Sequence, residues 1–394
     1  MMEKRPKILI VDDEPFNIDY LEQELEDLDY ETISAGNGQA ALELVEAESP
    51  DMILLDIMMP VMDGFEVLSR LKAEKSWRDI PVVVISAMSD MNSVVKAIEL
   101  GAEDYLPKPF DPTLLQARLN AGLEKKRLRD LEQLYLRGLE RELEIGREIQ
   151  AGFLPDEIPE IYGWEIRSYF KAAREVAGDF YDVFYLPEGK IGLMLGDVCD
   201  KGVGSALYMA LFRSLLRATS NMNAFAGGLN INNSGYESVN LIKYAITLTN
   251  NYICSVHQSA MFATLFFGVL DPLSGDLQYI NAGHEPPLII HKGQIKSKLM
   301  PTGPVVGVIE DMDFSVGDIK LEPDDLLLIY SDGVTDAQNA NGEMFEEERF
   351  ISIISQPVLS AESLINHIVS SMNTFIGEAV QFDDITLLAV LRKS

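Results

Sequence analysis

Cysteine and histidine are scarce in this sequence, and their scarcity excludes two common ways of building a small site. Of 394 residues only two are cysteine (Cys199 and Cys254) and four are histidine. Two cysteines cannot form a disulfide framework, so we expect a protein of the reducing cytoplasm. The four histidines do not stand at the spacing of metal ligands. A disulfide-stapled fold and a histidine-based metal site are therefore not expected.

Positive charge and long apolar runs are also lacking. The chain carries 63 acidic residues against 32 basic ones, a formal net charge of −31. Nucleic acid and anionic membrane both require clustered positive charge, so neither is expected as the main partner. No apolar run approaches the length of a membrane span. The first seven residues are charged and lead straight into a strand pattern, so no signal peptide is expected.

The sequence does contain enough chain and enough apolar residues for two or three domains (394 residues, 47% hydrophobic). In the first 120 residues, short apolar runs alternate with amphipathic stretches of helical length. The apolar runs cover residues 8–11, 31–35, 52–55, 82–85 and 104–106. This alternation predicts an α/β fold, a doubly wound five-stranded parallel sheet that binds ligands at the carboxyl ends of its strands.

Polar residues stand where these predicted strands end. They are Asp12, Asp13, Asp56, Ser86 and Lys108. Three converging carboxylates repel one another unless a cation neutralises them, and oxygen ligands suit Mg²⁺. The lysine and the hydroxyl could take the oxygens of a phosphoryl group, with Asp56 as the nucleophile that forms an acyl phosphate. Taken singly, the aspartate pair reads as helix N-caps and Ser86 as a strand-end cap, but the spaced set favours the chemical interpretation.

The motifs I-L-I-V-D-D-E, L-L-D-I-M-M-P-V-M-D-G, V-I-S-A and Y-L-P-K-P-F resemble those of two-component response-regulator receiver domains, over residues 7–123. The resemblance implies a cognate histidine kinase as phosphodonor. It also implies the roles of the site residues, with Asp56 as the phosphoacceptor. Asp13 would bind Mg²⁺ directly, Asp12 would bind it mainly through water, and the Met58 carbonyl would be a further Mg²⁺ ligand. Ser86 and Tyr105 would be the switch pair, and Lys108 would contact the phosphate and precede a cis peptide bond to Pro109.

A charged helical pattern covers residues 114–154, with no proline before Pro155. We expect residues 1–123 to form the receiver domain, residues 124–141 a helical linker, and residues 142–394 a second domain. Apolar positions along the helix predict a homodimer through an imperfect coiled coil, because Gly138 and Glu142 break a strict heptad. Mixed charge is equally typical of a solvated spacer helix, which stays the alternative.

Beyond Pro155 turn signals separate many short strand patterns, which cover residues 164–170, 179–186, 191–198, 261–271, 277–282, 287–291, 325–330 and 385–391. They predict an α+β domain, two antiparallel sheets packed face to face with helices outside (an α-β-β-α sandwich). The segment 218–235 is rich in Asn, Gly and Ser, and we expect a mobile loop without a catalytic role.

Aspartates again stand at predicted strand ends: Asp179, Asp182, Asp197, Asp332, Asp383 and Asp384. Acids without a basic group nearby require metal, and two divalent ions could activate a water for direct attack on a phosphoester. Arg174 could bind the substrate phosphate bidentately. Taken alone, Ser331-Asp332-Gly333 reads as a common turn and Asp383-Asp384 as a surface cap. His284 is expected to be a hydrogen-bonded structural residue rather than a base.

The motifs E-L-E-I-G-R-E-I-Q-A-G-F-L-P, A-M-F-A-T-L-F-F-G-V-L-D, N-A-G-H-E-P-P, S-D-G-V-T-D-A and D-D-I-T resemble the metal-dependent PPM (PP2C-like) serine/threonine phosphatases of bacterial sigma-factor partner switching, over residues 142–391. The resemblance implies two Mn²⁺ or Mg²⁺ ions and a phosphoserine or phosphothreonine substrate, an anti-sigma-factor antagonist. The implied ligands are Asp179, Asp197, Asp332, Asp383, the adjacent Asp384 and the Val198 carbonyl.

Two features depart from this second pattern: the Asn-rich segment is longer than usual, and one motif differs at a glycine. Ala177-Gly178 replaces the usual double glycine, which is tolerated if only Gly178 needs unusual torsions. The alternative function is a receiver-gated adaptor whose phosphatase-like domain binds a partner without catalysis.

Overall fold

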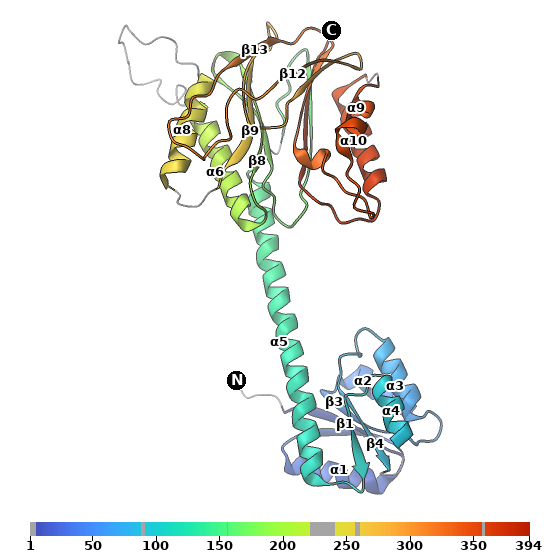
Figure 1. Cartoon of the computed structure of the whole chain (residues 1–394). Coiled ribbons are helices and arrows are strands. Elements are labelled where there is room, and N and C mark those ends of the chain that lie inside the picture. Colours follow the sequence, from blue (N-terminus) through green and yellow to red (C-terminus); the bar gives the residue numbers. More distant parts are fainter. Residues whose placement is uncertain (1–4, 88–90, 156, 221–240, 257–260, 357–358) are drawn as a thin grey trace. The chain divides into compact units, whose positions relative to one another are not determined.

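The structure is a computed structural model that describes residues 5–394 except 88–90, 156, 221–240, 257–260 and 357–358. The chain divides into two compact units, Met1–Leu139 and Glu140–Ser394 (Figure 1).

The first unit is built on a parallel sheet with the strand order β2-β1-β3-β4-β5. Its strands are β1 (Lys7–Val11), β2 (Glu31–Ala35), β3 (Met52–Asp56), β4 (Val82–Ala87) and β5 (Asp104–Lys108). Its helices are α1 (Pro15–Asp27), α2 (Gly38–Glu48), α3 (Gly64–Ala73) and α4 (Met91–Glu99), and α5 (Pro112–Ala151) begins after β5. The predicted doubly wound sheet is confirmed.

Each face of this sheet carries its own apolar core. Strand residues that point one way, such as Leu9 and Leu55, pack with α2, α3 and α4. Those that point the other way, such as Ile10 and Leu54, pack with α1 and the start of α5. Because both faces are covered, the central strands are apolar runs, and their polar residues come at the carboxyl ends. The fold therefore gathers polar chemistry at that edge.

Helix α5 is continuous over 40 residues. The Asp111 carboxylate caps its first turn by accepting the backbone N–H of Leu114 at 2.9 Å. Leu115 and Leu119 are buried, whereas Leu131 and other apolar residues in the middle of the helix are exposed. The helix predicted over residues 114–154 is confirmed, with its ends at Pro112 and Ala151. The predicted linker limits, residues 124 and 141, stay a prediction.

The second unit contains two antiparallel sheets with the strand orders β13-β10-β9-β8-β7 and β12-β11-β14-β15-β6. The strands are β6 (Trp164–Lys171), β7 (Phe180–Tyr185), β8 (Ile191–Val198), β9 (Ala263–Leu270), β10 (Asp276–Ala282), β11 (Leu288–His291), β12 (Gln294–Lys298), β13 (Gly317–Lys320), β14 (Asp325–Tyr330) and β15 (Ile385–Arg392). The helices after α5 are α6 (Val203–Ser220), α8 (Leu241–Val256), α9 (Glu346–Ile354) and α10 (Ala361–Ile376). In the described part of the chain, no helix combines the length and hydropathy needed to cross a bilayer.

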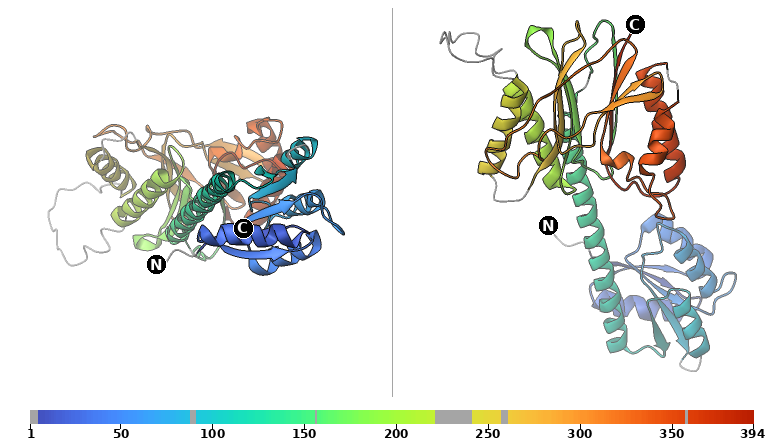
Figure 2. Two further views of the ribbon diagram at one scale, coloured as in Figure 1. Left: turned by 90° about the horizontal axis from the view of Figure 1, so that it is seen from below. Right: turned by 45° about the horizontal axis from the view of Figure 1, so that its top comes forward.

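Three apolar cores make the second unit a four-layer sandwich. The middle core lies between the sheets and takes alternate strand residues from both, such as Leu195 and Leu388. One outer core lies under α6 and α8, and the other lies under α9 and α10. Figures 1 and 2 show these helix pairs on the two outer sides of the sheets. The predicted α-β-β-α arrangement is confirmed, and strand alternation decides which side chains face the space between the sheets.

The sequence patterns missed some elements of this unit. Strands β12 and β13 lie at sheet edges and alternate exposed with half-buried residues, so neither forms an apolar run. The Asn-rich loop was predicted to start at Ala218, but residues 218–220 form the last turn of α6. There Ser220 is buried, and its hydroxyl donates to the Leu216 carbonyl at 2.6 Å. Residues 221–235 of the predicted loop lie outside the described residues.

Candidate functional site

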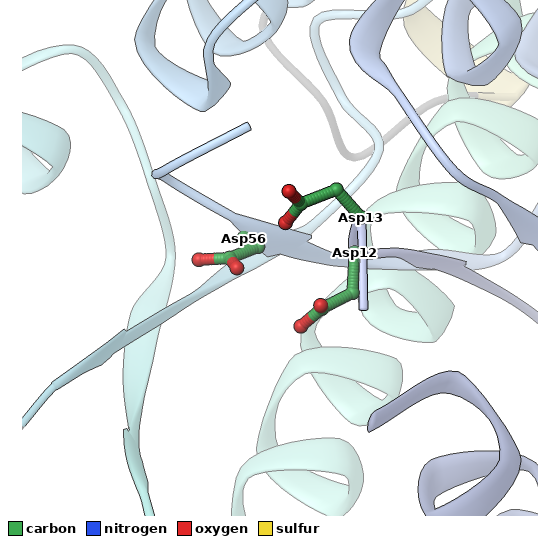
Figure 3. Close-up of side chains that lie close together, drawn as sticks. All are labelled: Asp12, Asp13 and Asp56. Atoms are coloured by element: carbon green, nitrogen blue, oxygen red, sulfur yellow. The ribbon is translucent and has the colours of Figure 1, made fainter. Parts of the chain in front are cut away.

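Three aspartates meet at the carboxyl edge of the parallel sheet. Asp12 follows β1 and Asp56 ends β3, and these two strands are neighbours. Carboxylate oxygens of Asp12, Asp13 and Asp56 all lie within 4.8 Å of one another (Figure 3). Asp12 and Asp56 are buried, and Asp13 is exposed. An oxygen-only set this tight fits a small divalent cation such as Mg²⁺.

Lys108 provides the positive charge beside these acids. Its ammonium donates hydrogen bonds to Asp12 Oδ2 and to Asp56 Oδ2, both at 2.8 Å. Burial raises the pKa of the Asp56 carboxyl, although Lys108 opposes that effect. Burial by itself lowers the pKa of Lys108, but the hydrogen bonds to the two aspartates outweigh it, and the pKa is raised. The Lys108 ammonium is therefore held at the Asp56 carboxylate, which is predicted to accept phosphate.

The other predicted residues of this site lie on the neighbouring strands and loop. The Met58 backbone N–H donates to Asp56 Oδ1 at 3.3 Å. Ser86 on β4 is buried, and the β4–β5 register sets it opposite Pro107, one residue before Lys108. Tyr105 on β5 packs, partly buried, against the core under α2, α3 and α4. The peptide bond between Lys108 and Pro109 is cis, as predicted.

A second acidic group lies at one end of the sandwich in the other unit. Asp179 directly precedes β7, and the β7–β8 register, with Phe180 opposite Gly196, brings Asp179 next to Asp197. Asp179 is buried, and its carboxylate accepts a hydrogen bond from the Thr386 hydroxyl on β15. Both sheets of the sandwich thus contribute to this site.

The pKa values of three carboxyl groups in this second site are raised, first by burial and then by their mutual repulsion. Burial and the neighbouring charge of Asp197 raise the pKa of Asp179 well above its ordinary range. Burial, followed by the charges of Asp332 and Asp383, raises the pKa of Asp197 to about 7. Burial and the charge of Asp383 raise the pKa of Asp332 to about 6. Carboxyl groups whose pKa values are raised in this way form a site where a divalent cation can compete with protons.

The two acidic sites differ in their spacing. Among the residues that the structure describes, only Asp12, Asp13 and Asp56 form an acidic group with oxygens all within 4.8 Å of one another. The aspartates of the second site are spread more widely. Their oxygen-only donor set still fits Mg²⁺ or Mn²⁺, with Asp179, Asp197, Asp332 and Asp383 as the candidate ligands.

The prediction that no basic group lies near these aspartates is wrong. The ammonium of Lys201, in the turn after β8, lies 2.8 Å from Asp383 Oδ2. The same ammonium lies 4.8 Å from the centre of the Phe382 ring. The turn that follows Asp197 folds Lys201 back toward the segment before β15. One of the predicted metal ligands therefore already has a cationic partner.

Asp384 holds backbone groups rather than pointing both oxygens into the acidic group. Its Oδ1 accepts the backbone N–H of Ala173 at 2.7 Å, and its Oδ2 accepts that of Gly178 at 2.8 Å. Two such hydrogen bonds stabilise a carboxylate without a cation. The geometry therefore favours a positioning role for Asp384, which was predicted as a metal ligand beside Asp383.

Glycine is required at position 178 because a side chain would not fit there, and not because the backbone adopts an unusual φ. A Cβ at this position would lie 2.8 Å from the Val198 carbonyl oxygen and 3.4 Å from Asp197 Oδ1. Its φ does not lie in the left-handed region. The sequence-based expectation made the tolerance of Ala177 conditional on unusual torsions at Gly178 alone, whereas the structure gives a steric reason for glycine at position 178.

Asp182 does not belong to this site. It is fully buried and forms ion pairs with Arg213 and Arg217 on α6, each at 2.9 Å. Asp179 and Asp182 are three residues apart, and an odd spacing in an extended segment sends the two side chains to opposite faces. Asp182 therefore fastens helix α6 to the outer face of β7.

Arg174 is exposed and lies on the segment that joins β6 to β7. It lines a pocket of about 440 Å³ together with Arg147, Lys171 and Glu175. No contact between Arg174 and the aspartates is present in the described residues, so its predicted role on the substrate phosphate stays a prediction.

His284 is a buried structural residue in this fold. Its Nδ1 lies 2.8 Å from the Thr264 hydroxyl, and burial lowers the pKa of the imidazole to about 4. A neutral histidine enclosed in this way has no access to substrate, which agrees with the role expected from the sequence.

Sequence reasoning missed two residues that hold Asp179 in place. Thr386 is the last residue of D-D-I-T, and Gln150 lies within E-I-Q-A-G-F-L-P. The Gln150 side chain bonds to both backbone groups of Ala177. Both residues stand inside the motifs that carry the resemblance, which is a signal that could have singled them out, but nothing in their type indicates the contact.

Comparison with known proteins divides the chain in the same way. A model of the response regulator receiver domain matches residues 8–120, and a model described as stage II sporulation protein E (SpoIIE) matches residues 187–393. Protein IcfG of Synechocystis is 42% identical over 263 residues, which cover 64% of this chain and 41% of that protein. The alkaline phosphatase synthesis transcriptional regulatory protein PhoP of Bacillus subtilis is 39% identical over 122 residues, 31% of this chain and 50% of that protein. The chain thus spans half or less of the length of these curated relatives.

The solved structures agree at the level of fold. The SiaA-PP2C domain of Pseudomonas aeruginosa superposes with a TM-score of 0.52 at 21% identity, and the match covers 66% of this chain and 99% of that one. At this identity the likeness supports the sandwich fold alone.

Proposed function

The chain belongs to the stage II sporulation protein E (SpoIIE) family and carries a receiver domain ahead of its PP2C-type phosphatase domain, and on this premise we propose a phosphatase controlled through Asp56. In this proposal a histidine kinase phosphorylates Asp56. The phosphatase domain hydrolyses phosphoserine or phosphothreonine on a partner protein of the anti-sigma-factor antagonist class, and the phosphorylation state of Asp56 controls its rate.

The observation that carries the proposal is the convergence of Asp179, which is buried, with Asp197 and Asp332, which are partly buried. Burial, and after it the charges of neighbouring aspartates, raises the pKa of each of these carboxyl groups, and two divalent ions, Mn²⁺ or Mg²⁺, would neutralise them. When bound, such ions withdraw charge from the phosphoryl oxygens and make the attacking water more acidic. Thr386 holds the Asp179 carboxylate, and Asp384 holds the backbone that leads to it. No side chain of the group is a strong nucleophile, which favours direct hydrolysis.

The contacts at Asp56 support the control step. Lys108 lies at hydrogen-bond distance from the carboxylate, where it would bind a phosphoryl oxygen after phosphorylation. Such a switch would redirect Lys108 from the Asp56 carboxylate to the phosphoryl group, four residues before helix α5 begins at Pro112. We propose that this helix carries the change, and that it pairs with a second copy of the chain through its exposed apolar residues. Whether phosphorylation raises or lowers turnover is an outcome of the experiment below.

The test is phosphoester hydrolysis by the full-length protein. With Mn²⁺ and p-nitrophenyl phosphate we expect turnover in the wild type and a loss of at least about 100-fold in Asp197→Asn and in Asp332→Asn. Asp276→Asn is the matched control, because Asp276 is exposed on β10 and lies outside the site. Equal turnover in all four proteins would refute the assignment. Repeating the assay with a phosphoryl mimic bound at Asp56, and with the Asp56→Asn variant, tests the control step.

The Lys201–Asp383 ion pair favours a second candidate, an adaptor that captures a partner without catalysis. A lysine on Asp383 reduces the need for a cation there. Calorimetric titration with Mn²⁺ separates the two functions. Binding of metal that is lost in Asp197→Asn supports the phosphatase, and a lack of binding together with phosphorylation-dependent partner capture supports the adaptor.

A further inference from the structure

The last turn of helix α5 contains one buried polar side chain. Gln150 is 8% exposed, whereas its neighbours Ile149 and Ala151 are exposed. Glutamine is seldom buried unless its amide is paired, because an unpaired amide loses its hydrogen bonds to water. The burial of Gln150 therefore calls for a partner, and the structure provides one.

The partner is the backbone of Ala177. Gln150 Nε2 donates to the Ala177 carbonyl at 2.6 Å, and the Ala177 N–H donates to Gln150 Oε1 at 2.9 Å. The side-chain amide thus satisfies both backbone groups of one residue, as a neighbouring strand would. Glutamate could supply only the acceptor, and alanine neither group.

Ala177 lies two residues before Asp179. The next residue, Gly178, gives its N–H to Asp384 and has no room for a Cβ against the Val198 carbonyl. The segment is therefore fixed by Gln150 on one side and by Asp384 on the other. Gly146, one turn before Gln150, faces Val176 with 3.7 Å between the site of its missing Cβ and a Val176 methyl group. The end of α5 consequently lies against the segment over two consecutive residues, Val176 and Ala177.

We propose that Gln150 is a positioning residue for the phosphatase site, through which the end of helix α5 holds the backbone of Ala177 and so places the Asp179 carboxylate for metal. This inference rests on the proposed function. It assigns the contact between α5 and the acidic group to one side chain. A shift of about 1 Å in the position of a catalytic group such as this carboxylate can lower the rate roughly 100-fold.

The test uses the full-length chain with Gln150→Ala, and with Gln133→Ala as the matched control on an exposed position of the same helix. Mn²⁺ affinity by calorimetry, and kcat and KM for p-nitrophenyl phosphate, are measured well below the unfolding temperature. We expect Gln150→Ala to weaken Mn²⁺ binding by at least about 10-fold and to lower kcat by roughly 10- to 100-fold at fixed Mn²⁺, with KM changed less than about threefold. Gln133→Ala should match the wild type.

A purely structural role predicts a different pattern, in which the unfolding temperature falls while Mn²⁺ affinity and kcat of the folded protein stay within about twofold of Gln133→Ala. That pattern would overturn the proposal. If Gln150→Ala does not fold, Gln150→Glu decides, because glutamate keeps the acceptor for the Ala177 N–H and loses the donor, while its added negative charge by itself would attract Mn²⁺ rather than weaken binding. A loss of Mn²⁺ affinity of about threefold or more in Gln150→Glu supports the proposal, and a smaller change overturns it. Should the wild type bind Mn²⁺ without hydrolysing phosphoesters, the proposed function fails while the metal titration still tests Gln150.

Discussion

Gly178→Ala tests the steric account of the phosphatase site. The new methyl group would lie 2.8 Å from the Val198 carbonyl oxygen, 3.4 Å from Asp197 Oδ1 and 3.4 Å from Ser205 Cβ. The first distance is shorter than real Cβ contacts, and its partner is backbone that cannot rotate away. Either the backbone at position 178 or the end of strand β8 must therefore move.

The size of the effect follows from the packing. Overfilling a closed site costs roughly 1–3 kcal/mol of unfolding free energy. The lost flexibility of the unfolded chain offsets about 0.4–1 kcal/mol of this cost. We expect a net loss of about 1–2 kcal/mol. Because the displaced Val198 carbonyl is a predicted metal ligand, Mn²⁺ affinity should fall as well.

The assay can isolate the second unit, because each unit contains one of the two tryptophans. In a Trp77→Phe background, urea unfolding followed by fluorescence reports on Trp164, which is 6% exposed. Gly204→Ala is the matched control. A Cβ on Gly204 meets nothing within 4 Å, and alanine in a helix should leave stability unchanged or raise it by up to about 1 kcal/mol. If Gly178→Ala unfolds at the same urea concentration as the parent and binds Mn²⁺ equally well, the steric account is refuted.

Three further predictions concern charge, pH and the long helix. Asp182→Ala leaves Arg213 buried without its partner, and it should lower the unfolding free energy by roughly 3–5 kcal/mol in urea unfolding, against no change for exposed Asp276→Ala. The imidazole of His284 has a folded-state pKa of about 4, below its unfolded value of 6.5, so its neutral form stabilises the fold above pH 6.5 and this stability is lost as pH falls toward 4. The difference between the two pKa values corresponds to about 3 kcal/mol of unfolding free energy, at roughly 1.4 kcal/mol per pH unit. Urea unfolding at about pH 7.5 and about pH 5 should show a smaller pH-dependent loss of unfolding free energy in His284→Gln than in the wild type. Leu131→Pro should break α5 and abolish the effect of Asp56 phosphorylation on turnover while leaving Mn²⁺ binding intact, and regulation that survives it would identify the helix as a spacer.

The predictions from sequence succeeded where a periodic pattern and a chemical motif coincide. Buried parallel strands read as apolar runs, so the acids at their ends, such as Asp12 and Asp56, stood out. In the second unit, central strands such as β8 were predicted with the bounds that the structure has. Edge strands β12 and β13 were missed because half of each strand faces solvent and its composition resembles a loop.

Individual contacts were harder to predict than elements. The sequence placed Asp182 with Asp179 because both follow the same motif, although strand alternation sends them to opposite faces. Lys201 was overlooked because its partner in the ion pair, Asp383, lies far along the chain. Such a contact depends on a turn and on the packing of two sheets, and neither is a local property of the sequence.

The position of β15 in its sheet has a consequence for how the chain becomes active. Strand β15 lies between β14 and β6, and it pairs with β6 along its whole length, from Ile385 opposite Lys171 to Arg392 opposite Trp164. Contacts between such distant segments form late, because a long loop must close first. Thr386, which holds Asp179, and Asp384, which holds the segment before it, both come from the start of this strand or directly precede it. A growing chain can therefore complete the local strand–helix contacts of its receiver domain during synthesis, whereas its second acidic site assembles only after the β15 segment has left the ribosome.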